Sequence, residues 1–390
     1  MKKLNVLLRG NLRQYVMIIA LVVVIIFFQI VTKGTLLSPL NISNIIQQNA
    51  YIFVLATGML LCILTCGNID LSVGSVAGFV GAVSAVFILK MNMPVFPAIL
   101  ISLLIGVVIG IWHGFWIAYV GVPAFITTLA GMLIFRGLTM VILQGQSLAP
   151  FPKSFTFIAA GFIPEIANIN GINLLAILAG IVASILYILS ELSNRRSKKR
   201  YNFEVSSVGV FLAKIIAIVA VINAFTYALS RYKGIPMVLV IVVSLVLIYS
   251  FITNKTIPGR HIYAYGGNPK AAKLSGVKTK RVLFWVYVNM GFLAALAGII
   301  FTGRLNSATP KAGNGFEMDA IASCFIGGAS TTGGIGTVVG AIVGGLLMGV
   351  LNNGMSIMGV SIDWQQAIKG VVLLAAVAFD VYSKSRSRVI

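Results

Sequence analysis

Long apolar runs separated by short polar stretches fill almost all of this 390-residue chain. A helix needs about 20 apolar residues to cross a bilayer, so the pattern predicts an all-α polytopic membrane protein with about twelve transmembrane or half-spanning helices. The third, fifth, tenth and eleventh of these contain Gly or polar clusters and are candidates for half-helices or re-entrant segments. The twelve predicted segments cover approximately residues 14–32, 45–66, 71–89, 95–119, 122–143, 172–190, 208–229, 235–253, 282–303, 317–335, 337–357 and 364–382.

Charge agrees with a membrane location and predicts an orientation. Only 9% of the residues are charged, against about 25% in soluble proteins. With the N-terminus inside, the cytoplasmic segments hold nineteen basic residues and the outside segments seven, which predicts that both termini are cytoplasmic. The net charge of +21 is therefore a topology signal and does not indicate nucleic-acid binding. Lys214 and Lys369 lie near span ends and can snorkel, whereas Arg136 lies deeper.

The sequence lacks the residue patterns of an enzyme. It has no Ser/His/Asp set, no HExxH motif, no acids paired at helical spacing and no GxxxxGK[ST] loop. The three cysteines lie within apolar runs and the two histidines are far apart, so no metal site is predicted. We therefore predict a transporter that binds no cofactor itself. If ATP drives it, a partner subunit hydrolyses the ATP.

One polar stretch, CGNIDLSVGSVAGFVG from Cys66 to Gly81, holds Asp70, the only acidic residue among the first 164. A carboxylate at mid-membrane costs roughly 2.5 to 3.5 kcal/mol, so Asp70 marks a helix end near the surface, a polar cavity or an ion site. We favour a structural turn at the inner end of an outward-going helix, where Asp70 or Ser72 caps free N–H groups. Gly74 and Gly78 would then let that helix pack closely.

A weak internal repeat relates this stretch to ASTTGGIGTVVGAIVG, which begins at Ala329. The repeat sets Gly74 on Gly336 and Gly78 on Gly340. Glycines at this spacing are common in membrane helices, so chance similarity is an alternative. If the repeat is real, Gly336 and Gly340 belong to a second structural turn, and two duplicated bundles flank a pathway.

The cytoplasmic segment 254–281 contains seven basic residues, a breaker at Pro258-Gly259 and a turn at residues 266–269. A short helix is predicted from Lys270 to Leu274, and Gly276 ends it. A short helix between two turns is a means by which a permease can contact a motor domain. An amphipathic interfacial helix held by anionic lipid is an equally good interpretation.

At this point the sequence resembles a known family. Four stretches together are similar to the permease subunits of bacterial monosaccharide ABC importers, above all the xylose-type and multiple-monosaccharide permeases. They are IDLSVGS from Ile69, VPAFITTLAGM from Val122, YAYGGNPKAAKLSGV from Tyr263 and the Gly-rich run from Ile326 to Gly349. The resemblance implies a homodimer in the bacterial cytoplasmic (inner) membrane. It also implies that a separate ABC ATPase, which holds ATP–Mg, drives import of a pentose or hexose from an extracytoplasmic sugar-binding protein.

The resemblance also implies an organisation for the chain. Residues 1–390 would form one permease domain, with a first bundle at about 14–143, an added hairpin at about 172–229 and a second bundle at about 235–382. Segment 254–281 would be the loop that couples the permease to the ATPase. The coupling residues would be Asn268, Pro269, Lys270, Ala271, Ala272, Leu274 and Gly276.

A neutral sugar has many hydroxyls, so its path should offer amides, hydroxyls and aromatic faces. Amides within spans also join helices to one another, so individual members of this set are weaker candidates than the set. The opposing hypothesis is an ion-coupled secondary transporter that uses Asp70, Arg136 and Glu317, although a relay needs a chain of ionisable groups. The pathway candidates are Asn44, Gln47, Gln48, Asn49, Phe125, Thr127, Thr128, Asn289, Asn352 and Asn353.

Overall fold

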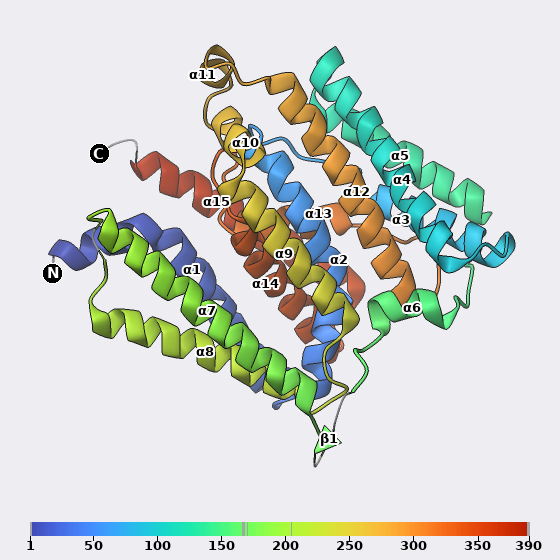
Figure 1. Cartoon of the computed structure of the whole chain (residues 1–390). Helices are drawn as coiled ribbons and strands as arrows, with labels where there is room; N and C mark the ends of the chain where they lie inside the picture. Colours follow the sequence, from blue (N-terminus) through green and yellow to red (C-terminus); the bar gives the residue numbers. More distant parts are fainter. Residues whose placement is uncertain (1, 166–167, 170, 204, 388–390) are drawn as a thin grey trace.

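Helices make up most of the computed structural model (Figure 1). The structure describes residues 2–165, 168–169, 171–203 and 205–387. Its strands, β1 (Asn168–Ile169) and β2 (Ile172–Asn173), form one small antiparallel hairpin. The helices are α1 Lys2–Val31, α2 Pro39–Leu64, α3 Val73–Ala85 continued by the π-helix η1 Val86–Lys90, α4 Val95–Gly114 continued by the π-helix η2 Phe115–Val120, α5 Ala124–Leu143, α6 Lys153–Ala160, α7 Leu174–Arg200, α8 Val208–Ser230, α9 Met237–Lys255, α10 Ile257–Gly267, α11 Pro269–Leu274, α12 Thr279–Leu305, α13 Phe316–Ile326, α14 Val338–Ile357 and α15 Ile362–Ser387.

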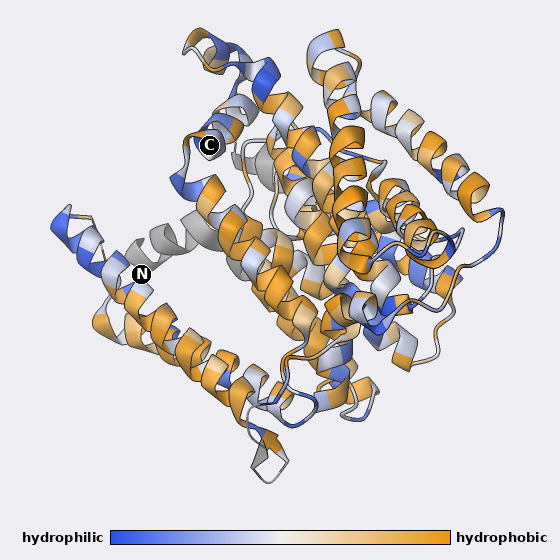
Figure 2. Ribbon diagram, turned by 45° about the vertical axis from the view of Figure 1, so that its right-hand side comes forward, coloured by the Kyte–Doolittle hydropathy of each residue, from blue (hydrophilic) through white to orange (hydrophobic). Residues whose placement is uncertain are grey.

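The predicted all-α membrane fold is confirmed. Within the described residues, nine helices are long and apolar enough to cross a membrane. Figure 2 shows apolar residues along most of the length of these helices, with hydrophilic residues gathered at the helix ends. The predicted count of about twelve stays a prediction. In Figure 1, α10 and α11 lie at one end of the bundle, the α11 side, and α6 and β1 lie at the other end, the α6 side.

Helices α2 and α12 form the centre of the bundle. In the apolar 18-residue stretch of α2, 83% of the residues are buried, whereas in that of α8 only 11% are buried. The two central helices run antiparallel, because Gly58 lies against Met290 and Leu293 while Leu61, three residues later, lines a cavity with Val286. On its other side α12 packs on α4 through Gly106 and Gly291, each of which leaves no room for a Cβ beside the other. Small residues allow this close backbone approach.

Two helix pairs, α2 with α3 and α12 with α13, are arranged as inverted copies. Helix α3 runs parallel to α12, since Gly81 lies against Thr302 one turn beyond the contact of Ala77 with Gly298. Helix α13 runs parallel to α2, since Tyr51 stacks on Phe316 and the Sγ of Cys324 donates to the carbonyl of Ala56. Inverted repeats of this kind are frequent in transporters.

The inverted copies meet at Gly74 and Gly313, where a Cβ on either residue would overlap the carbonyl oxygen of the other. The sequence repeat instead sets Gly74 on Gly336, and those two residues differ in backbone conformation and in position relative to a helix. Gly74 is the second residue of α3, whereas Gly336 has a φ of +151° and lies before α14 begins. Periodicity within one segment could not reveal the inverted relation, which exists only between packed helices.

The tenth predicted segment, 317–335, was one of the four candidates for half-helices, and the structure agrees with that interpretation, because the segment does not form one continuous span. Helix α13 ends at Ile326, and the loop 327–337 follows it. Gly328, Gly333 and Gly334 have φ values of +84°, +83° and +70°, a region that glycine adopts readily and that is incompatible with a continued helix. The third, fifth and eleventh segments are instead long helices. Helix α2 begins at Pro39, six residues earlier than predicted, because proline fits the first turn of a helix.

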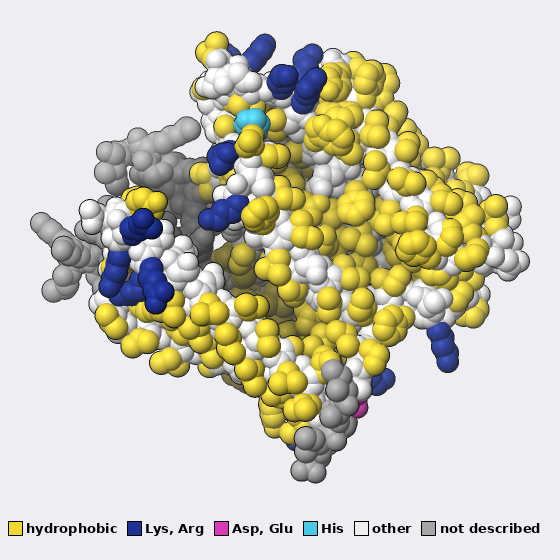
Figure 3. Space-filling view, viewed as in Figure 1, with side chains coloured by type: hydrophobic (Ala, Val, Ile, Leu, Met, Phe, Trp, Pro, Cys, Tyr) yellow, Lys and Arg dark blue, Asp and Glu magenta, His cyan; other side chains and the backbone are white. Residues whose placement is uncertain are grey.

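Helices α7 and α8 form a hairpin of their own. Asn223 donates to the Oγ of Ser184 over 2.9 Å, and Gly180 lies directly against Thr226. Lys214 forms an ion pair of 2.6 Å with Glu191 across the hairpin. Figure 1 shows the hairpin leaning away from the main bundle toward the α7–α8 connection. Figure 3 shows basic side chains at the tip of this hairpin and around α10 and α11, and apolar side chains over much of the rest of this face.

Candidate translocation pathway and coupling segment

Amide side chains join α2 to α14 near the α6 side. Asn41 and Asn353 are buried and exchange two hydrogen bonds, of 2.8 and 3.0 Å. Asn353 also donates to the Oε1 of Gln48 over 3.4 Å. Because each amide both donates and accepts, the cluster fixes the two helices relative to one another.

Other predicted pathway residues surround this cluster. Gln47 donates to the carbonyl of Ala160 in α6 over 3.3 Å, and Asn49 is buried against Gly349 of α14. Asn44 is half-buried on the same stretch of α2. Asn352 is half-buried, and its Oδ1 has no hydrogen-bond partner among the described residues. The structure thus brings six of the ten candidates to one region.

The remaining four candidates lie elsewhere. Thr127 and Thr128 are buried in the first turns of α5, where their hydroxyls donate to carbonyls of their own segment. Phe125 is 59% exposed on the surface of α5. Asn289 lies on α12 and accepts a hydrogen bond from the hydroxyl of Tyr249. The ten residues therefore do not line one continuous channel in this chain.

A buried group of charged and aromatic side chains links three helices. The carboxylate of Asp319 accepts from the Tyr51 hydroxyl at 3.1 Å and from the Lys369 ammonium at 2.9 Å. The Lys369 side chain is 20% exposed and that of Asp319 is 3% exposed. The expectation that Lys369 snorkels is therefore wrong: its ammonium turns inward, because a buried carboxylate offers a stronger partner than distant water.

A cavity of about 330 Å³ lies beside this group, between α13, α14 and α15, and has both polar and apolar residues on its wall. Asn314, Glu317, Gln366 and Lys369 line it. The Oε2 atom of Glu317 is buried without a hydrogen-bond partner among the described residues. This cavity differs from the expected uncharged path in having both an acid and a base on its wall.

The turn before α3 is built around Asp70. Its Oδ1 accepts two hydrogen bonds from Ser72, one from the backbone N–H at 2.8 Å and one from the hydroxyl at 2.6 Å. Ser72 is the residue before the first residue of α3, but its side chain makes no capping hydrogen bond. Of the two predicted capping residues, only Asp70 therefore binds a backbone N–H group at this helix start, that of Ser72. Asp70 is only 3% exposed. Gly78 lies directly against the carbonyl of Ala312, and Gly340 lies against that of Gly327. Both glycines allow backbone contact that no other residue would permit.

The predicted short helix in segment 254–281 is confirmed as α11, which begins one residue earlier than expected. The Oδ1 of Asn268 accepts from the backbone N–H of Ala271 at 3.0 Å and so caps this helix. Gly276 follows with a φ of +84°. Pro258 does not break the chain but lies in the first turn of a further helix, α10. Of the predicted coupling residues, Ala272 is buried, and the exposed ones are Asn268, Pro269, Lys270, Ala271, Leu274 and Gly276.

Helix α10 contacts both the turn after α2 and the loop between α13 and α14, which lie on the α11 side. The Tyr263 hydroxyl donates to the carbonyl of Gly336 at 2.7 Å. The Sγ of Cys66 donates to the carbonyl of Tyr265 at 3.3 Å. The backbone N–H of Gly334 donates in turn to the carbonyl of Leu64 at 3.0 Å. A displacement of α10 would therefore reach the turn after α2 and the loop before α14 together.

Residues 41–377, which hold all of these features, match the family described as branched-chain amino acid transport system / permease component. The chain belongs to this family of transport permeases. The permease is 39% identical to the xylose transport system permease protein of Haemophilus influenzae over 96% of its own length and 98% of that protein. It is 36% identical to the xylose transport system permease protein of Escherichia coli, over 97% and 94% of the two chains.

A third relative is the ribose import permease protein of Bacillus subtilis, at 36% identity over 90% of the permease and 87% of that protein. A comparison with solved structures gave no match. The family and the long apolar helices together make the permease a multi-pass protein of the inner membrane.

Sequence reasoning missed several residues of the permease that the structure brings together. Asn41 was outside the predicted second span, because α2 begins earlier than its apolar run. Tyr51 and Asp319 come from different helices, and no local pattern indicates their contact. Tyr249 was not among the predicted residues, although its hydroxyl donates a hydrogen bond to Asn289. The one available signal was the rarity of acids in the chain, which marks Asp319 as a residue that needs a partner.

Proposed function

We propose that this permease is the membrane subunit of an ATP-driven ABC importer that carries a monosaccharide, xylose or another pentose or hexose, into the cytoplasm by alternating access. The contact of α10 with the turn after α2 and the loop between α13 and α14 is the observation that carries the proposal, since it supplies a route from an external motor to the inverted helix pairs. Relatives named for xylose and ribose, aligned over nearly the whole chain, support the substrate class.

The family description names branched-chain amino acids, and the pathway chemistry favours sugars over them. An amino acid carries separate ammonium and carboxylate charges, each of which needs a buried counter-charge. The amides around Asn41 and Asn353 carry no charge, and Asp319 and Lys369 neutralise each other. Amide groups in a cleft suit the hydroxyls of a neutral sugar.

In this proposal the α11 side is cytoplasmic, and both termini lie there. A cytoplasmic ABC ATPase, which holds the ATP–Mg, contacts the segment from Asn268 to Gly276. An extracytoplasmic sugar-binding protein delivers the sugar at the α6 side, near the amide cluster. The permease acts as a homodimer embedded in the lipid bilayer. It binds no cofactor itself. The α7–α8 hairpin is an addition to two bundles that otherwise make up one permease domain.

The proposal is tested in proteoliposomes that contain the permease, its ATPase and the sugar-binding protein. We expect xylose or another monosaccharide to accumulate inside only with ATP. Leu274→Asp should abolish ATPase association and uptake, because Leu274 is 90% exposed on α11 and a buried contact there would be lost. Leu274→Met is the matched control and should retain both. Uptake driven by a proton or sodium gradient without the ATPase would contradict the proposal.

A further inference from the structure

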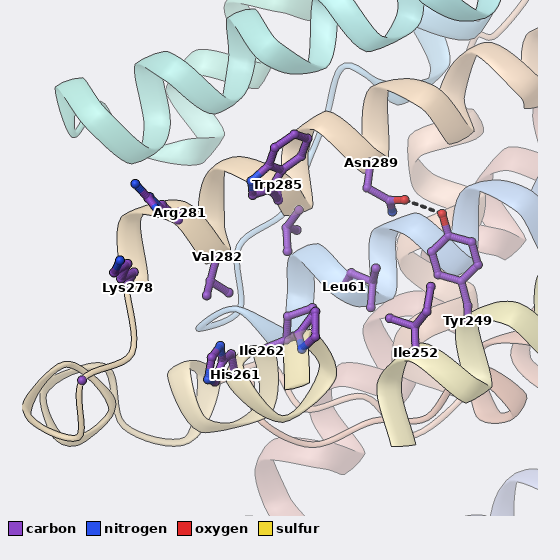
Figure 4. Close-up of a pocket in the computed structure, with 13 residues that line it drawn as sticks. Leu61, Tyr249, Ile252, His261, Ile262, Lys278, Arg281, Val282, Trp285 and Asn289 are labelled. Atoms are coloured by element: carbon purple, nitrogen blue, oxygen red, sulfur yellow. Dashed lines mark hydrogen bonds between the residues drawn. The ribbon is translucent and has the colours of Figure 1, made fainter. Parts of the chain in front are cut away.

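A cavity of about 500 Å³ opens between α9, α10 and α12, with Leu61 of α2 on its wall (Figure 4). None of the amides of the α2–α14 cluster lines it. Its inner wall is apolar and includes Ile252, Ile262, Val282 and Val286. The hydrogen bond between Tyr249 and Asn289 closes its deep end.

The mouth of the cavity is basic. Lys278 and Arg281 are exposed there, and His261 is half-buried beside them. None of the described lining residues is acidic, and neither Lys278 nor Arg281 forms an ion pair with a described residue. Figure 4 shows these basic side chains at one end of the cavity and Asn289 at the other. The mouth thus offers two cations without a counter-ion.

The dimensions of the cavity match one half of a bilayer. Lys278 and Asn289 lie at its two ends along α12, and at about 1.5 Å per residue they are about 16 Å apart. One leaflet of hydrocarbon is about 15 Å thick. Trp285 lies between the two ends, about 10 Å along α12 from Lys278, and is 63% exposed, so its indole would lie beside a bound acyl chain.

We propose that this cavity binds one anionic phospholipid, with its phosphate between Lys278 and Arg281 and an acyl chain along the apolar wall toward Asn289. A soluble anion would need the basic mouth but not the apolar wall, and a neutral lipid would need the wall but not the mouth. Basic pockets between helices on the cytoplasmic side suit anionic headgroups. The assignment to the cytoplasmic leaflet rests on the orientation given under the proposed function.

The site adjoins the segment that connects α11 to α12. Gly276 lines the cavity, and Lys278 is the residue directly before α12 begins. A bound headgroup would therefore hold this connection in place, and with it the position of α11 relative to the membrane. The lipid would act as a positioning element for the coupling segment.

Lipid binding is measured on the permease alone, without ATPase or binding protein, so that its failure is separate from failure of the transport proposal. Brominated phosphatidylglycerol and brominated phosphatidylcholine are added at equal mole fractions. The emission of Trp285 is obtained as the difference between the wild type and Trp285→Phe. We expect brominated phosphatidylglycerol to quench half of the Trp285 emission at a mole fraction more than tenfold lower than brominated phosphatidylcholine requires. The reason is that each basic residue raises the affinity for an anionic headgroup about fivefold.

The double variant Lys278→Gln/Arg281→Gln should lose this preference, whereas the control Lys255→Gln/Arg260→Gln should keep it. The control removes the same charge from exposed residues of the same segment that do not line the cavity. Native mass spectrometry of retained phosphatidylglycerol provides a second readout. Equal quenching by the two lipids, equal loss in both double variants, or displacement by inorganic phosphate would overturn the proposal.

Discussion

The hydroxyl of Tyr263 on α10 donates a hydrogen bond of 2.7 Å to the backbone carbonyl of Gly336, 73 residues later in the chain. This bond joins the coupling segment to the loop between α13 and α14. The partner is a backbone atom, so the contact depends on the position of the loop and not on the identity of its side chains.

Tyr263→Phe should lower ATP-driven uptake about fivefold while the permease remains inserted, because loss of one hydrogen bond costs about 1 kcal/mol. The matched control is Tyr265→Phe, whose half-buried hydroxyl makes no hydrogen bond with a described residue. Uptake assays of both variants at equal protein amounts provide the measurement. Equal uptake in the two variants would show that the hydrogen bond between Tyr263 and Gly336 does not contribute to ATP-driven uptake.

The same bond predicts a flat pH dependence. Burial raises the pKa of Tyr263 above its ordinary value of 10.0, so the phenol keeps its proton, and the contribution of the bond is lost only as pH rises through that raised pKa. We expect the ratio of wild-type to Tyr263→Phe uptake to stay constant between about pH 6 and pH 9. A ratio that changes across this range would place another titrating group at the contact.

Gly276→Arg should abolish uptake without affecting insertion. The residue has a φ of +84°, which most side chains adopt only with strain, and it lies directly after α11. Gly276→Asn should retain most uptake, because asparagine tolerates this region far better. Co-purification with the ATPase separates the two variants, and normal association of the arginine variant would refute the coupling role of this segment.

Asp70→Asn should keep substantial uptake, because an amide oxygen can accept the same two hydrogen bonds from Ser72. Asp70→Ala should lower stability by about 1 kcal/mol through loss of those bonds. Thermal unfolding in detergent and uptake with ATP are the two measurements. If Asp70→Asn abolished uptake in a stably folded protein, the charge itself would be required and the ion-site hypothesis would return.

The ion pair between Asp319 and Lys369 provides a test by double-mutant cycle. Asp319→Asn and Lys369→Met should each destabilise the protein by about 3 kcal/mol, because either leaves a buried charge without its partner. The double variant should be less destabilised than the sum of the two. Additive losses in thermal unfolding would mean that the pair does not act as a unit.

Gly74→Val should prevent stable folding, because a side chain there would overlap the backbone of Gly313, and overpacked contacts typically cost about 1 to 3 kcal/mol or more. Gly137→Val is the matched control, since a Cβ at Gly137 meets nothing within 4 Å. Membrane yield and thermal stability compare the two. Wild-type stability of Gly74→Val would rule out the close approach of the inverted helix pairs.

Hydropathy predicted most of the long helices, because a helix in lipid must satisfy its own backbone and expose apolar side chains along its length. Local signals also located α11, since Asn268 caps it and Gly276 ends it within a few residues of chain. The glycines of segment 317–335 marked it as a candidate half-helix, and three of them with positive φ do interrupt the helix, although the apolar content of the segment resembles that of a span.

Contacts between distant segments were beyond the reach of sequence patterns. Asp319 and Lys369 are 50 residues apart, and Asn41 and Asn353 are 312 residues apart. Asp319, Lys369 and Asn353 alone each resemble an isolated polar residue in a predicted span, and Asn41 lies outside the predicted spans. Their contacts arise only from helix packing, which places α13 against α2 and α15 and places α14 against α2.

The meeting of the two helix pairs at Gly74 and Gly313 also bears on the discrimination between solutes. The starts of α3 and α13 lie beside this contact, and a helix start carries a partial positive charge that attracts anions in many transporters. Here Asp70 precedes α3, and Glu317 and Asp319 lie in the first turn of α13. These carboxylates offset the positive ends, so an anionic solute at this contact would gain little attraction from the two helix starts.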